Sequence, residues 1–162
     1  MSVNRYRPHV WIVPEDDANR QLANGFLLHP RLDLTSVDIR PVSGGWHRLL
    51  DSVVEQYAAE LRKYEHRQLV LLFDFDGQGD QRARRFRDRI PEGLRERVYL
   101  LGMRDEPETV KAALGYSFET MGQRLADACC QQEDGLWDNE HLRHNKPELD
   151  RLFVSVKPIL FP

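Results

Sequence analysis

Three carboxylates follow apolar segments of the sequence, at positions suited to chemistry on a phosphate group. Glu15 comes after the apolar run 9–13, and Asp74 and Asp76 come after the apolar run 69–73. Carboxylate oxygens with no softer ligand nearby suit a hard divalent cation such as Mg²⁺ or Mn²⁺, which also binds phosphate oxygens. The three residues therefore point to a metal site that assists phosphodiester or phosphoryl transfer.

Helix capping is the alternative role for acidic residues at such positions. Aspartate is favoured at helix N-termini, and Asp17 or Asp80 could serve there. Capping accounts well for a single acid, but less well for three acids at matching strand ends. We therefore keep the metal site as the first hypothesis.

Strands and helices must alternate to position these carboxylates. Apolar runs predict strands over 9–13, 37–42, 69–73 and 97–102, and helical spacing predicts helices over 18–26, 46–64 and 81–89 and after Pro107. This alternation predicts an α/β fold with a mostly parallel four-stranded sheet, helices on both faces and right-handed crossovers. In such sheets the ligand crevice lies beyond the carboxyl ends of the strands, so Glu15, Asp74 and Asp76 should converge there. Strand alternation places Asp74 and Asp76 on the same side.

The length and the pattern predict a single domain over 1–162. Its core spans about 9–115, and a helical C-terminal extension spans about 116–162, with a last helix at about 148–156. Cys129 and Cys130 are neighbours in a helical stretch, which excludes a disulfide between them and predicts two buried small residues. Trp11 and Trp46 are expected in the core.

Basic and histidine side chains offer further candidates. Arg82, Arg84 and Arg85 on the helix after the Asp pair could bind phosphates, or could form a solvated face. His141 and His144 are three residues apart and could share a helix face, as a second metal site or as support for the first. Surface positions are the alternative for both histidines.

Charge and hydropathy limit the partners. The formal net charge is −3, so no global positive field attracts nucleic acid, and any such contact must be local. No apolar segment is long enough for a signal peptide or a membrane span, which predicts a cytoplasmic protein without membrane contact.

Two families share the Asp-x-Asp motif. Phe73-Asp74-Phe75-Asp76-Gly77 resembles the opening of haloacid dehalogenase-type phosphatases, in which the first Asp is the nucleophile. That family has a Ser or Thr at the end of the next strand, whereas this chain reads Leu101-Gly102-Met103. Two strand-helix units also precede the motif here.

The order of motifs resembles the Toprim family of topoisomerases, primases, ribosomal RNA maturases and overcoming-lysogenisation-defect nucleases. Glu15, the turn Gly44-Gly45 and Asp74-Phe75-Asp76 match its first three strand ends, over about residues 9–115. By this resemblance Glu15 is the general acid or base, and Asp74 and Asp76 hold Mg²⁺. The resemblance also suggests Glu106, Glu108 and Lys111 as supporting residues, and Asp16 and Asp80 are further supporting candidates.

Three functions follow as expectations. The first is a magnesium-dependent, nuclease-like enzyme that acts on nucleic acid. The second is a non-catalytic or regulatory subunit that works with a separate ATPase partner, as in some split phage-defence nucleases. The third is a phosphatase of the haloacid dehalogenase type.

Overall fold

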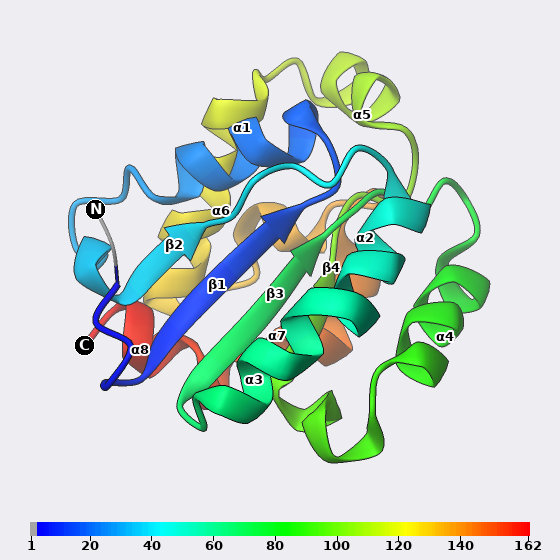
Figure 1. The fold of residues 1–162 in the computed structure, drawn as a ribbon. Coiled ribbons are helices and arrows are strands. Elements are labelled where there is room, and N and C mark those ends of the chain that lie inside the picture. The colour runs from blue at the N-terminus through cyan, green and yellow to red at the C-terminus, as the bar shows by residue number, and fades with distance from the viewer. Residues whose placement is uncertain (1–2) are drawn as a thin grey trace.

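Four parallel strands form the centre of the computed structural model, which describes residues 3–162 (Figure 1). The strands are β1 (His9–Pro14), β2 (Val37–Ile39), β3 (Arg67–Leu72) and β4 (Val98–Leu101), in the spatial order β2-β1-β3-β4. All three pairings are parallel. The prediction of an α/β fold with a parallel four-stranded sheet is therefore confirmed.

The pairing between β1 and β3 sets the positions of the acidic residues. Pro14 pairs with Leu72, and the backbone N–H of Glu15 donates to the carbonyl of Leu72 at 2.8 Å. The two central strands thus end at the same level. The residues that follow them start from one edge of the sheet.

One face of the sheet is covered in part by the helices that follow β2 and β3. These are α2 (Trp46–Ser52), a π-helical segment (Val53–Tyr57), α3 (Ala58–Lys63) and α4 (Gly79–Arg89). Their apolar side chains pack against Leu69, Leu71 and Phe73 of the β3 segment. The predicted helix 46–64 is present, with the π-helical segment in its middle.

The other face is covered by α1 (Asp17–Phe26), α6 (Phe118–Gln131), α7 (Lys146–Ser155) and α8 (Lys157–Leu160) (Figure 1). Val10, Ile12 and Val70 point to this side. Helix α5 (Pro107–Leu114) packs beside it on Met103 and Phe118. Short 3₁₀ segments complete the chain at Leu34–Ser36, Glu92–Arg97, Gly135–Asp138 and Arg143–Asn145.

Strand β2 is shorter than predicted. It ends at Ile39, and the N–H of Arg40 makes one more bond, to the carbonyl of Ile12. Pro41 follows and has no N–H to donate, so the ladder cannot continue in the same way. The chain then turns toward the end of β1.

The pair Cys129 and Cys130 and the pair Trp11 and Trp46 each have one buried and one half-buried member. Both cysteines are free, as predicted, but only Cys129 is buried, and Cys130 is half-buried. Trp11 belongs to the core, while Trp46 packs at its margin and is half-buried.

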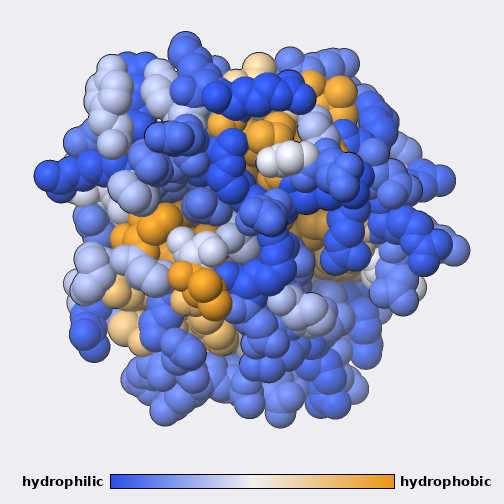
Figure 2. All heavy atoms as spheres, turned by 90° about the horizontal axis from the view of Figure 1, so that it is seen from below, coloured by the Kyte–Doolittle hydropathy of each residue, from blue (hydrophilic) through white to orange (hydrophobic). Residues whose placement is uncertain are grey.

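The face of the molecule shown in Figure 2 is mostly hydrophilic. Seen from below, apolar residues show only as small groups between polar ones (Figure 2). Among residues 3–162, no helix has both the length and the hydropathy needed to cross a membrane.

Candidate metal centre

The order of the strands creates a switch point between β1 and β3. The chain leaves β1 toward β2 on one side, and leaves β3 toward β4 on the other side. The two connections diverge, and in open α/β sheets this divergence leaves a crevice at the carboxyl ends of the strands. Glu15 directly follows β1, and Asp74 lies two residues beyond β3, so both border this crevice.

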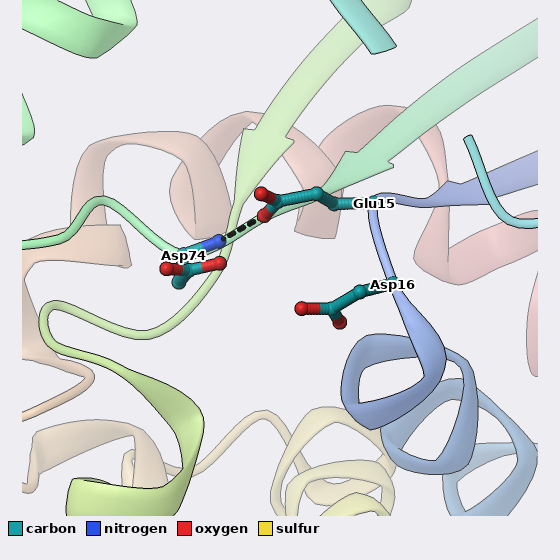
Figure 3. Close-up of side chains that lie close together, drawn as sticks. All are labelled: Glu15, Asp16 and Asp74. Carbon is teal, nitrogen blue, oxygen red and sulfur yellow. Dashed lines mark hydrogen bonds between the residues drawn. The ribbon is translucent and has the colours of Figure 1, made fainter. Parts of the chain in front are cut away.

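Glu15, Asp16 and Asp74 bring their carboxylates together at this switch point (Figure 3). One oxygen from each lies within 4.8 Å of the others. Glu15 is buried, and its Oε2 accepts a hydrogen bond of 3.0 Å from the backbone N–H of Asp74. Asp16 and Asp74 are half-buried, so the group is open toward solvent on their side.

Asp16 also caps helix α1. Its Oδ1 accepts from the backbone N–H of Asn19 at 3.0 Å and from the Asn19 Nδ2 at 2.9 Å. Both bonds use the same oxygen, so the other oxygen is free to bind a ligand. The cap is thus Asp16 and neither Asp17 nor Asp80, which lie in the first turns of α1 and α4.

The loop after β2 fixes the backbone of Glu15. The N–H groups of Gly44 and Gly45 both donate to the Glu15 carbonyl, at 2.9 and 3.2 Å. Their φ angles are +85° and +128°, a region that favours glycine. The glycine turn singled out in the sequence therefore lies beside Glu15.

Burial raises the pKa of Glu15 to about 8. The nearby carboxyl of Asp74 and the negative charge of Asp16 act in the same direction, and the Asp74 N–H opposes them. At pH 7 the Glu15 side chain is therefore mostly protonated. The group lacks positive charge, which a cation would supply.

Asp76 lies outside this group of carboxylates. β3 ends at Leu72, and Asp76 is exposed with a φ of +50°. The N–H of Gln78 bonds to the Phe75 carbonyl, which closes a tight turn around Asp76. Strand alternation therefore does not extend to Asp76, and the structure joins Asp16, rather than Asp76, to Glu15 and Asp74.

Arg82 is the arginine of α4 that reaches the site. It is buried, its Nη1 donates to the Asp74 carbonyl at 2.5 Å, and its guanidinium lies 4.5 Å from the ring centroid of Trp46. Within residues 3–162 its Nε has no hydrogen-bond partner. Arg84 and Arg85 are exposed, and Arg85 lies 5.6 Å from the Trp46 ring.

His141 and His144 do not share a helix face, because the chain between them turns into a short 3₁₀ segment. The buried His141 ring bonds through Nδ1 to the Asp105 carboxylate at 2.9 Å, and this bond lowers the pKa of Asp105. His144 packs edge-on against Phe75, with ring centroids 5.0 Å apart.

Asp105 was not among the predicted site residues. It is 36 residues from His141 in the sequence, so no local spacing predicts the pair. The loop that carries it bonds to the Asp76 turn, since the Gly77 N–H donates to the Arg104 carbonyl at 2.8 Å. The pair therefore lies at the same edge of the sheet as the metal centre.

The remaining supporting candidates are exposed and are not part of the acidic group. They are Asp80 on α4, Glu106 and Glu108 at the start of α5, and Lys111 on α5. The Lys111 Nζ lies 5.3 Å from the Phe118 ring centroid.

No protein-family model, curated protein or solved structure matches this chain. The candidate centre is therefore defined by its own geometry, which consists of three carboxylates at the switch point of a parallel sheet.

Proposed function

We propose that Glu15, Asp16 and Asp74 bind a divalent cation, Mg²⁺ or Mn²⁺, and that the domain cleaves phosphodiester bonds of nucleic acid. The observation that carries this proposal is the convergence of the three carboxylates within 4.8 Å. The resemblance to the Toprim family supplies the reaction class. The switch point between β1 and β3 supplies a crevice for the ligand.

The donor set fits a hard cation. All three ligands offer oxygen, no nitrogen or sulfur ligand belongs to the group, and Mg²⁺ typically takes a few carboxylates while it keeps several waters. The raised pKa of Glu15 is a sign of excess negative charge that a cation would offset. When bound, such a cation polarises a phosphoryl oxygen and lowers the pKa of a bound water.

The surrounding residues have separate roles in this proposal. Glu15 must lose its proton before its carboxylate can bind the cation. Arg82 holds the Asp74 carbonyl and so fixes that residue. Arg84 and Arg85 are exposed on the same helix and provide local positive charge for a phosphate backbone, although the chain is acidic overall.

Metal binding is tested first, by calorimetric titration of Mn²⁺ and Mg²⁺ into the wild type and three variants. Asp74→Asn and Asp16→Asn are expected to weaken binding at least about tenfold, because each removes one charged ligand. Asp76→Asn is the matched control, since Asn also tolerates a left-handed backbone. A loss with Asp76→Asn and none with Asp16→Asn would favour the set Glu15, Asp74 and Asp76 instead.

Cleavage is tested next, with single- and double-stranded DNA and RNA in Mg²⁺ or Mn²⁺. The wild type and Asp76→Asn are expected to cut at least one of these substrates, and Asp74→Asn and Glu15→Gln are expected to be inactive. Equal activity in all four proteins would point to a contaminating nuclease and contradict the proposal. Metal binding without cleavage would favour the regulatory subunit with an ATPase partner.

A further inference from the structure

A second candidate binding site lies on the part of the sheet that no helix covers. Helices α2 and α3 lie over β3, while β1 and β2 are left open on the same side (Figure 1). A groove with a volume of about 300 Å³ occupies this position. Its lining shares no residue with the metal centre.

Four cations line the groove, and two of them have carboxylate partners. Arg40 bonds to Asp38 at 3.0 Å, and Arg67 bonds to Glu60 at 2.8 Å. Arg5 and Lys63 are exposed and form no ion pair within residues 3–162. The groove therefore carries two uncompensated positive charges in a protein whose net charge is −3.

Aromatic rings hold these cations in place. The Arg67 guanidinium lies 3.5 Å from the ring centroid of Trp11 and 4.4 Å from that of Tyr64. The Arg40 guanidinium lies 4.2 Å from Trp11, and the Arg5 Nη1 donates to the Tyr64 hydroxyl at 2.9 Å. Stacked guanidinium groups lose little further freedom when they bind a ligand.

The buried His9 also holds the Arg67 side chain in place. The Arg67 Nε donates to His9 Nε2 at 2.8 Å, and His9 Nδ1 lies 2.7 Å from the Arg7 carbonyl. The acceptor role of Nε2 requires the proton on Nδ1, so His9 is neutral in this arrangement. Burial lowers the pKa of His9, in agreement with this tautomer. Arg67 is thus held at one orientation at the base of the groove.

Two donors at the groove lack acceptors. The Nε1 of Trp11 and the Nε of Arg40 are buried and have no hydrogen-bond partner within the described chain. Buried donors are normally satisfied, so unpaired ones require an explanation. A phosphate oxygen beside Arg40 would supply the acceptor that its Nε lacks.

We infer that this groove binds a phosphate group, carried either by a small phosphorylated molecule or by a nucleic-acid backbone. Fixed arginines bind phosphate in preference to less charged anions, because their paired N–H donors match its oxygens. The two uncompensated cations match the charge of a phosphate dianion. The inference does not depend on the proposed nuclease activity.

The test uses the full chain in EDTA, which removes divalent cations from the metal centre. Inorganic phosphate, AMP and a ten-residue oligothymidylate are each titrated calorimetrically into the wild type and the double variant Arg5→Ala/Lys63→Ala. The double variant is expected to bind roughly tenfold more weakly, with a shallower salt dependence, because two phosphate-facing charges are lost. Arg31→Ala/Arg143→Ala, which removes two exposed arginines outside the groove, is the charge-matched control.

The three probes separate the two sources of phosphate. Binding of phosphate or AMP supports a small ligand, and binding of the oligonucleotide alone supports a nucleic-acid backbone. Failure of all three to bind, or equal affinity of the double variant and the wild type, would overturn the inference. Asp74→Asn should bind these three probes like the wild type. A negative result for the metal centre can therefore be told apart from a negative result for the groove. If the double variant unfolds at a lower temperature than the wild type, Lys63→Met alone provides the comparison.

Discussion

The backbone N–H of Asp74 donates a hydrogen bond of 3.0 Å to the Oε2 of Glu15, and this bond joins the ends of the two central strands. The bond alone favours the ionised form of Glu15. Burial, the carboxyl of Asp74 and the charge of Asp16 outweigh it, and they raise the pKa of Glu15 to about 8. The ionised form of the metal-free site is therefore electrostatically unfavourable.

Glu15→Gln is expected to stabilise the metal-free protein at pH 8.5, by roughly 1–3 kcal/mol. The Gln carbonyl can still accept from the Asp74 N–H, while the buried negative charge is removed. Urea denaturation in EDTA at pH 5 and pH 8.5 measures the difference. At pH 5 the two proteins should have nearly equal free energies of unfolding.

The direction in which stability changes with pH follows from proton binding. The ordinary pKa of Glu15 is 4.5 and its folded value is about 8, so between these values the folded protein holds more protons than the unfolded chain. The stability of the wild type therefore decreases as pH rises through this window, and Glu15→Gln should lack this dependence. A variant that is less stable than the wild type at pH 8.5 would show that Glu15 is not buried as described.

Binding of Mn²⁺ is expected to release about one proton at pH 7, because Glu15 must ionise to become a ligand. Calorimetric titrations in buffers of different ionisation enthalpy measure this number directly. At pH 9.5 the released fraction should approach zero, and the apparent affinity should be higher. Heats that do not vary with the buffer at pH 7 would exclude Glu15 as a ligand.

Local patterns predicted the parts of the site that depend on strand ends. The apolar runs before Glu15 and Asp74 specify buried parallel strands, and parallel strands present their carboxyl ends at one edge. The strands' spatial order then places these two residues side by side. This part of the site needs only hydrophobic pattern and topology.

Tertiary contacts decided the parts that sequence patterns missed. The backbone at Asp76 is left-handed in a turn where Phe75 N–H bonds to Met103 and Gly77 N–H bonds to Arg104. Those bonds come from the loop after β4, which no spacing near Asp76 reveals. The phosphate groove was missed in the same way, because Arg5, Arg40 and Lys63 come from separate segments that only the folded chain brings together.

Asp16 has two roles that substitutions can separate. Asp16→Ala is expected to lower the free energy of unfolding by about 1 kcal/mol, because the cap of α1 is lost. Asp16→Asn keeps an oxygen for the Asn19 N–H and should change stability by only a few tenths of a kcal/mol. Both variants should lose metal affinity, as measured by Mn²⁺ titration alongside urea denaturation. Equal stability of the two variants would remove the capping role.

Helices α1 and α6 pack with their backbones in contact, and glycine makes this possible. A Cβ at Gly122 would lie 2.1 Å from the Leu22 carbonyl oxygen and 2.7 Å from the Phe26 nitrogen. Backbone atoms cannot move aside without separating the helices, so Gly122→Ala is expected to lower the free energy of unfolding by at least about 2 kcal/mol.

Gly93→Ala is the matched control, because its Cβ would meet nothing within 4 Å. Thermal and urea denaturation compare the two variants, and Gly93→Ala should change stability by less than about 0.5 kcal/mol. A similarly small loss for Gly122→Ala would mean that the crossing of α1 and α6 tolerates a methyl group, which would contradict the backbone contact described here.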